Sequence, residues 1–389
     1  MKANIKDAEH LISLINGSRY FHELYLINIG KGLYNAYNGS YKGLLSWITH
    51  TQDVYKHLSF DKLPYFITRY SNSESKDRFS LLSESFSGLY HGFDENNLIT
   101  IKTLAWYARE DSPKQYRKWH NKRYKKKILS LLMSGSNDDI ARVIYIFGML
   151  DFIYSFPEKK WLYFTDHGWF EDKDNDKIRD FISSILRPYI INLIKDFIQK
   201  NEENTADYIK CNRLLFKLSS RSFINNVINS SICYFGTPHM LDNNPNITRV
   251  TNGVLEISNT SVIYRYGIPE DYLSLCTGVG YNCDYTWDHI DITICVDWLR
   301  TIIPNRDFVE KFLLICSNWM RRHNNTSIHY DFLGQVNIIN ILLHYVFDDY
   351  FNTRIKFIGE CNIDPHDDNI TEEIIKMAPS FFWIICNYS

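Results

Sequence analysis

The segment RKWHNKRYKKK, residues 117–127, is the one basic patch of the chain. Lysine and arginine neutralise phosphates and aromatic rings stack on bases, so this mixture suits single-stranded nucleic acid. A solvated helix face would have the same composition, and the sequence leaves both interpretations open. The candidate nucleic-acid-binding residues are Arg117, Lys118, Trp119, Lys122, Arg123, Tyr124, Lys125, Lys126 and Lys127.

Histidine and cysteine show no spacing typical of a metal centre. The 13 histidines include no H-E-x-x-H, and the eight cysteines include no C-x-x-C pair. Cys276 and Cys283 lie closest together, at a spacing that fits no common zinc pattern. No Ser-His-Asp or Cys-His arrangement can be argued from spacing either. We therefore expect free thiols, no metal ligands and no catalytic residue.

The patch lies in a first segment that is predicted to be helical up to about residue 133. Apolar residues recur at helical spacing over 24–48, and Asn38-Gly39-Ser40 divides them into two helices. A further helix is predicted over 98–108, with Thr100 as its N-cap.

The stretch 134–137 is the best linker candidate, and Ser136 or Asn137 can cap a helix that continues towards Tyr154. Asp166-His167-Gly168 between aromatic flanks predicts a hairpin, and 248–265 reads as strands. Helices are expected over 175–200, 205–218, 222–232, 298–303 and 308–320. Two short apolar runs, 355–358 and 381–385, fit buried strands of a parallel sheet.

Length and charge bound the remaining possibilities. The 389 residues, 45% of them hydrophobic, are enough for two or three domains with real cores. A formal net charge of -2 excludes a protein that is basic all over, so nucleic-acid binding requires a local face. The charged N-terminus lacks a signal peptide, and no run reaches the ~18 apolar residues of a membrane span.

The middle of the chain carries a dense phrase of Asn, Gly, Pro and acidic residues. It reads LDNNPNITRVTNGVLEISN and then RYGIPEDYLSLCTGVGY. It resembles the domain that precedes the helicase in viral and phage primase-helicases. The matching positions are Leu241, Asp242, Asn244, Pro245, Asn252, Gly253, Val254, Pro269, Glu270, Asp271, Tyr272, Ser274, Thr277 and Gly278.

Other segments share this resemblance. WLYFTDHGWFEDKDNDKIRDFISSI and LSSRSFINNVINSS are similar to the opening and to a later helix of the same domain. YLINIGKGLYNAYNGSYKGLLSWI and ITIKTLAWYAREDSPKQY are similar to the small helical primase C-terminal domain. The likeness runs from about residue 20 to the end, and the catalytic primase domain has no counterpart.

The resemblance implies that a superfamily 3 helicase, a ring-forming ATPase, follows the phrase. HYDFLGQVNIINILLHYVFDDYF aligns with its P-loop and the next helix, which places Gly334, Val336 and Asn337 in the phosphate-binding loop. Val336 then stands where the family has the lysine that reaches the β- and γ-phosphates. No lysine occurs between Lys311 and Lys356, so a shift of register does not restore it.

Two further positions match helicase motifs. Glu360 corresponds to the acidic second motif, and Asn387 corresponds to the sensor asparagine at the tip of a central strand. The sequence stops at Ser389, before the family's arginine finger and lid. The nucleotide site is therefore expected to be degenerate, with no cofactor bound.

The sequence predicts a mainly α fold with α+β parts. The expected domains are a helical primase-C-terminal-like domain (1–133), a collar domain of helices and hairpins (134–296), and a degenerate, truncated α/β P-loop core of AAA+-like type (297–389). The predicted function is a non-catalytic, replication-related viral protein that binds DNA or a replication partner.

Two other functions stay open at this point. One is an active ATP-dependent helicase with an atypical P-loop, which would need ATP and Mg²⁺. The other is an interaction module without a nucleic-acid role. The family resemblance implies a hexameric ring, and the expected location is the host cytoplasm or the virion, a reducing compartment without a membrane partner.

Overall fold

Two compact units make up the chain in this computed structural model. The structure describes residues 5–57, 78–94, 98–200, 205–244, 246–257, 262–303, 305–320, 336–350 and 368–387. Unit 1 comprises Met1–Leu150 and Asp180–Tyr234, and unit 2 comprises Asp151–Arg179 and Phe235–Ser389. The sequence-based domain limits at 133/134 and 296/297 stay predictions.

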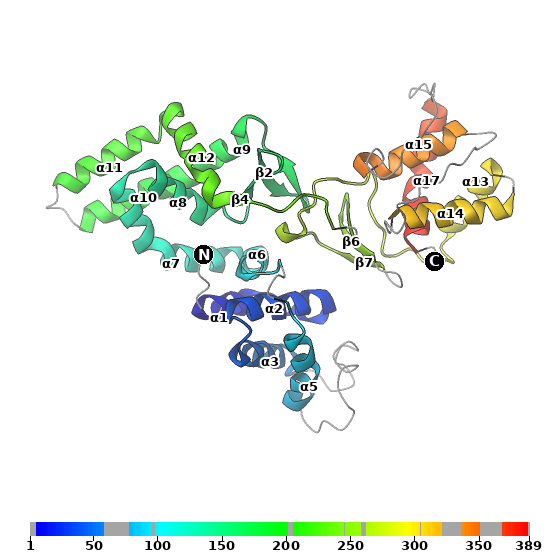
Figure 1. The fold of residues 1–389 in the computed structure, drawn as a ribbon, viewed down its shortest axis with the longest axis horizontal. Helices are drawn as coiled ribbons and strands as arrows, with labels where there is room; N and C mark the ends of the chain where they lie inside the picture. The colour runs from blue at the N-terminus through cyan, green and yellow to red at the C-terminus, as the bar shows by residue number, and fades with distance from the viewer. Residues whose placement is uncertain are drawn as a thin grey trace. The chain divides into compact units, whose positions relative to one another are not determined.

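Unit 1 is helical throughout its described part (Figure 1). Its elements are α1 (Ile5–Leu14), η1 (Gly17–Phe21), α2 (Glu23–Ala36), α3 (Tyr41–Tyr55), α5 (Arg78–His91), α6 (Ile101–Asp111), α7 (Pro113–Ser134), α8 (Asn137–Gly148), η4 (Phe181–Leu186), α10 (Arg187–Lys200), α11 (Thr205–Lys217) and α12 (Arg221–Phe235, whose last residue falls in unit 2).

The predicted helix boundaries of unit 1 are largely confirmed. Asn38 and Gly39 both have positive φ between α2 and α3, as a turn at this point requires. Thr100 caps α6 by accepting a hydrogen bond from the Lys102 amide. Ser136 caps α8 by accepting one from the Asp139 amide. Local signals therefore fix where these helices begin.

One boundary was predicted wrongly. The helix after residue 137 was expected to continue towards Tyr154, but α8 ends at Gly148. Residues Phe152–Ser155 form strand β1 instead. This strand pairs with β2 and with the distant β4, so long-range hydrogen bonds override the local helical pattern.

Unit 2 combines two small sheets with a group of helices. Its elements are β1 (Phe152–Ser155), β2 (Lys160–Thr165), β3 (Gly168–Glu171), η3 (Lys173–Asn175), α9 (Asp176–Asp180, whose last residue falls in unit 1), β4 (Gly236–Thr237), β5 (Ile247–Val250), β6 (Gly253–Ile257), β7 (Val262–Arg265), η5 (Pro269–Asp271), α13 (Ile290–Ile302), α14 (Arg306–Met320), α15 (Val336–Phe347), η6 (Asp348–Tyr350) and α17 (Asp368–Asn387).

The first sheet contains the predicted hairpin. Its strand order is β3-β2-β1-β4, with β4 parallel to β1 and the other pairs antiparallel. Thr165 pairs with Gly168, and the two residues between them, Asp166 and His167, have φ of 44° and 66°. Positive φ at both central positions is the signature of a two-residue hairpin turn.

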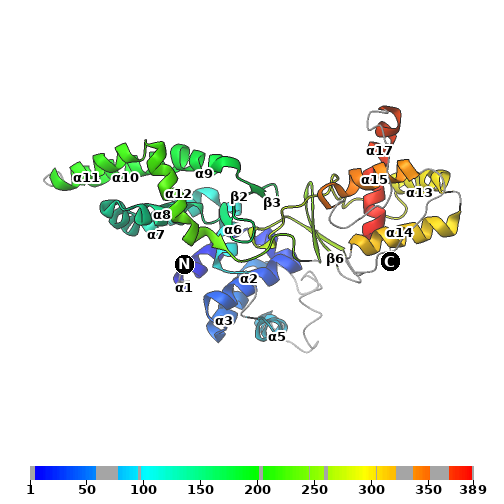
Figure 2. The ribbon, with the colours of Figure 1, turned by 45° about the horizontal axis from the view of Figure 1, so that its top comes forward.

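The second sheet packs against the helices of unit 2. Its antiparallel order is β5-β6-β7, and Val250, Leu255 and Ile257 share one core with α13, α14, α15 and α17. Each of the other three helices contacts α17, and the four gather together in both views (Figures 1 and 2). This arrangement makes α17 the central helix of the group.

The predicted strand at 381–385 is wrong, because these residues lie inside α17. The side chains from Phe381 to Cys386 are all buried, at most 5% exposed, since neighbouring helices surround them. A short apolar run fits a buried strand and a buried helix equally well, and periodicity cannot separate the two. The other predicted strand, 355–358, lies outside the described residues.

The fold class is mainly α with α+β parts, as the sequence predicted. No helix in the described ranges combines the length and the apolar composition that a membrane crossing requires.

Candidate nucleic-acid interface

The basic patch lies on α7, a helix with one buried face. Pro113 occupies its first turn, and Gly135 ends it in the left-handed conformation. The buried side chains recur every four residues and fix the orientation of the helix: Tyr116, His120, Tyr124, Ile128 and Leu132. The cations between them therefore point away from the core.

The opposite face of α7 is cationic. The helix contains no aspartate or glutamate. Among the described residues, five exposed cations of the basic patch make no ion pair: Arg117, Lys118, Lys122, Lys126 and Lys127. Such a face attracts a polyanion, because nothing on the helix neutralises it.

Two other cations of the patch are used inside the protein. Arg123 donates to both carboxylate oxygens of Asp7 on α1, at 2.7 and 3.0 Å. This hydrogen bonding raises the pKa of the Arg123 guanidinium above its ordinary value. Lys125 lies 3.5 Å from Asp196 on α10. Both residues therefore tie α7 to its neighbours rather than serving only as ligands for phosphate.

The aromatic residues of the patch are placed differently from one another. Tyr124 is buried in the helix core, 6% exposed. Trp119 is half-buried and stacks on His10 of α1, with ring centroids 5.6 Å apart and planes inclined by 27°. Only Trp119 therefore remains within reach of a ligand at the surface.

A surface groove of about 780 Å³ lies along α1 and α7. Residues of both helices line it: Lys6, Asp7, His10, Leu14, Gln115, Lys118, Trp119, Lys122 and Arg123. Since the Asp7 carboxylate is bound by Arg123, the lysines dominate the charge of the groove. Lys6 and His10 were not predicted as site residues, because α1 lies about 100 residues before α7 in the chain.

His120 lies on the buried face of α7 and has a lowered pKa. It is 6% exposed, and its Nε2 lies 3.1 Å from the Ile146 carbonyl oxygen. Burial penalises the charged imidazolium and lowers the pKa of His120 to about 4.

We expect this histidine to make unit 1 sensitive to acid. The unfolded chain binds a proton below pH ~6.5 and the folded chain only near pH 4, so stability is complete above pH ~6.5 and falls between those values. The loss is on the order of 3 kcal/mol. Urea unfolding at pH 7.5 and 4.5 measures it. His120→Gln, which keeps an N–H donor, should flatten the dependence, and an unchanged slope would contradict this explanation.

The residues predicted to form the nucleotide site are only partly described. Gly334 and Glu360 lie outside the described residues. Val336 is the first residue of α15, followed by Asn337, so a helix begins where the resemblance places the P-loop helix. Asn387 lies at the end of α17 rather than at a strand tip, and its amide donates to Tyr281 Oη and to the Trp383 carbonyl.

The phrase from Leu241 to Gly278 forms an internal framework in unit 2. Asp242 accepts hydrogen bonds from the Ser274 and Leu275 amides. Asn252 exchanges two hydrogen bonds with the Tyr281 backbone. These side chains form hydrogen bonds with the protein's own backbone, so they stabilise the fold rather than forming a ligand site.

Gly278 shows why one glycine of this phrase is needed. Its amide donates to the Val346 carbonyl of α15, and a Cβ at this position would come within 2.0 Å of the Tyr345 carbonyl oxygen. Only glycine permits such a close approach of two backbones. The phrase therefore docks directly on the helix that starts at Val336.

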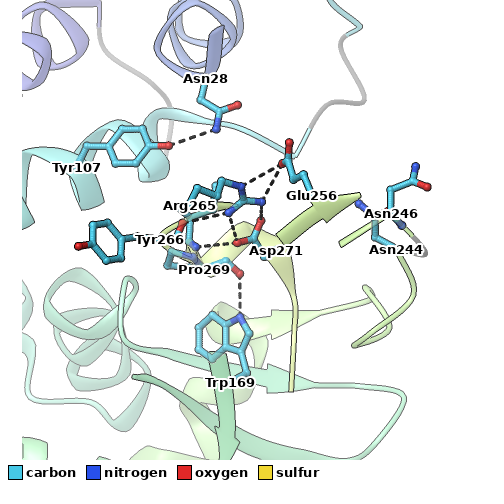
Figure 3. Close-up of polar contacts among 11 residues, drawn as sticks. Asn28, Tyr107, Trp169, Asn244, Asn246, Glu256, Arg265, Tyr266, Pro269 and Asp271 are labelled. Atoms are coloured by element: carbon cyan, nitrogen blue, oxygen red, sulfur yellow. Dashed lines mark hydrogen bonds and ion pairs between the residues drawn. The ribbon is translucent and has the colours of Figure 1, made fainter. Parts of the chain in front are cut away.

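A buried cluster at Arg265 completes this framework (Figure 3). Its guanidinium donates to both oxygens of Asp271, at 2.6 and 2.7 Å, and twice to Glu256 Oε1. A fifth hydrogen bond reaches the Tyr266 carbonyl. Nearby, Trp169 Nε1 donates to the Pro269 carbonyl, which joins β3 of the first sheet to η5. Sequence reasoning did not identify Arg265.

The described side chains show no metal centre. Within the described ranges, no three His, Cys, Asp or Glu residues come together in a group that could hold a metal ion. The cysteines whose side chains are described carry no disulfide. The groove along α1 and α7, with its lysines and its aromatic pair, is the candidate site of the described structure.

The chain is similar to a known protein family and to a viral helicase. A family model described as "D5 N terminal like" matches residues 147–304. A putative helicase of Acanthamoeba polyphaga mimivirus is 26% identical over 287 residues, which are 67% of this chain and 28% of that protein. The chain is therefore related to the viral primase-helicases, as the resemblance implied. It matches just over a quarter of the length of this curated relative.

Proposed function

We propose that this chain is a replication-related protein that binds DNA through the exposed face of α7 and does not hydrolyse ATP. The relationship to viral primase-helicases supports the replication role. The cationic face of α7 supports the DNA-binding role, and the residues at the head of α15 support the absence of hydrolysis.

The observation that carries the proposal is the unbalanced charge of α7. The five cations of the basic patch that make no ion pair in the described structure lie on a helix with no acidic residue. The chain as a whole has a net charge of -2, so this face is a local exception. Lysine and arginine side chains that neutralise phosphates release the counterions condensed on the nucleic acid, which drives association.

The nucleotide site lacks the group that ATP hydrolysis needs. Val336, at the start of α15, stands where related helicases carry a lysine. That lysine neutralises charge developing on the β- and γ-phosphates, and no lysine lies between Lys311 and Lys356 to replace it. Removing charge stabilisation of this kind costs roughly 3–4 kcal/mol in the transition state, a loss of about 10²–10³ in rate.

Calorimetry and a hydrolysis assay test the catalytic part of the proposal. We expect no measurable heat on titration with Mg-ATP and no phosphate release above background when single-stranded DNA is added. Asn337→Ala should change neither result. DNA-stimulated hydrolysis that disappears in Asn337→Ala would instead establish an active helicase with an atypical P-loop.

A further inference from the structure

The groove along α1 and α7 combines positive charge with a ligand-sized volume and an aromatic pair. Its volume of about 780 Å³ lies within the range of about 300–1,000 Å³ that is usual for ligand sites. Lys118 and Lys122 lie one helical turn apart and both line it. Residues with this spacing are neighbours on the helix surface, with Cβ atoms about 5–6 Å apart. Successive phosphates of one strand can therefore meet both ammonium groups.

An aromatic pair lies in the same groove. His10 is exposed, lines the groove, and rests on the indole of Trp119. Trp119 is in turn held by Tyr116 and Tyr124, with ring centroids 5.7 and 6.5 Å away. A base that enters the groove therefore meets rings that are already stacked and fixed by the core of unit 1.

We infer that this groove binds single-stranded nucleic acid, with phosphates against Lys118 and Lys122 and a base on the His10–Trp119 pair. The inference rests on the proposed DNA-binding function and adds the class of ligand. Bases of a duplex are paired and stacked on one another, so they are not available to an aromatic pair. Bases of a single strand are available, and stacking of this kind tolerates every sequence.

Binding of three labelled ligands by the full chain tests this inference. The ligands are an oligothymidine of about 20 nucleotides, an abasic strand with the same number of phosphates, and a duplex of the same length. We expect the oligothymidine to bind about fivefold more tightly than the abasic strand, or more, because a stacked base contributes this much. The duplex should also bind more weakly than the oligothymidine.

A variant of the exposed ring isolates stacking from charge. His10→Ala should lower the affinity for oligothymidine towards that for the abasic strand, and should leave abasic binding and its salt dependence unchanged. The matched control is His91→Ala, an exposed histidine at the end of α5 that is not among the groove residues. This control should leave all three affinities unchanged.

The outcomes separate the inference from the proposed function. Equal affinities of the wild-type chain for oligothymidine and the abasic strand, with no effect of His10→Ala, would overturn the inference and leave DNA binding by charge intact. Preferred binding of duplex would overturn it as well. No binding of any ligand at about 50 mM salt would remove the proposed function itself.

Discussion

Replacing Asp271 with alanine is expected to lower the free energy of unfolding of unit 2 by about 3–5 kcal/mol. Arg265 is 4% exposed, and its guanidinium donates five hydrogen bonds to acceptors within the protein (Figure 3). The substitution removes two of these bonds together with the one that the Ile268 amide donates to Asp271. Of the two carboxylates that pair with this buried cation in the described structure, only that of Glu256 is left, and its side chain is 30% exposed. An unbalanced buried charge costs far more than the pair contributes.

Urea unfolding followed by tryptophan fluorescence measures this effect. The matched control is Glu310→Ala, which breaks the ion pair of Arg306 and Glu310 on α14, where both side chains are largely exposed. An exposed pair of this kind contributes at most about 1 kcal/mol. A loss for Asp271→Ala no larger than that of the control would show that the Arg265 cluster does not hold the framework together.

The double charge reversal Lys118→Glu/Lys122→Glu is expected to weaken binding of single-stranded DNA about 50-fold or more at low salt. Each substitution removes a phosphate contact in the groove and adds a charge that repels the backbone. Both residues are exposed and make no ion pair in the described structure, so the fold should be unaffected. Fluorescence anisotropy with a labelled strand measures the change in Kd.

The control for this experiment has the same change in net charge at another place. Lys42 and Lys56 are exposed residues of α3 and its C-cap, in the same unit but outside the groove. Lys42→Glu/Lys56→Glu should lower the affinity only slightly, because screening limits charge effects to about 10 Å at 0.1 M salt. Equal losses in the two variants would mean that binding responds to net charge and that α7 is no specific site.

The parts of the fold that local signals determine could be predicted from the sequence. Thr100 and Ser136 offer side-chain oxygens to the first free amides of α6 and α8, and both caps are confirmed. Asp166 and His167 form the expected tight turn. In each case the residues that determine the cap or the turn lie within a few positions of it in the sequence.

The parts that depend on distant partners could not be predicted. The run at 381–385 is apolar on every side because three helices surround α17, and this surrounding is invisible in the sequence. Strand β1 forms because β2 and β4 supply hydrogen-bond partners, the latter about 80 residues away. Tertiary contacts decided both elements.

The candidate site also has a part that could be predicted from the local sequence and a part that depends on distant residues. The cations of α7 are a local run and were identified from composition. The groove that they line needs α1, which supplies His10 for stacking and Asp7 for pairing with Arg123. The likeness to primase-helicases is strongest in the phrase at 241–278, yet Asp242, Asn252 and Asp271 of this phrase make internal hydrogen bonds.

Binding of the wild-type chain to single-stranded DNA without nucleotide, measured across salt concentrations, tests the central claim most directly. Two to five cations of α7 that contact phosphate predict a linear fall of log K with log salt, with a slope of about −1.4 to −3.5. We expect this slope to be the same with and without Mg-ATP. Absence of binding at about 50 mM salt, or binding that does not respond to salt, would contradict the claim that this chain acts through the cationic face of α7.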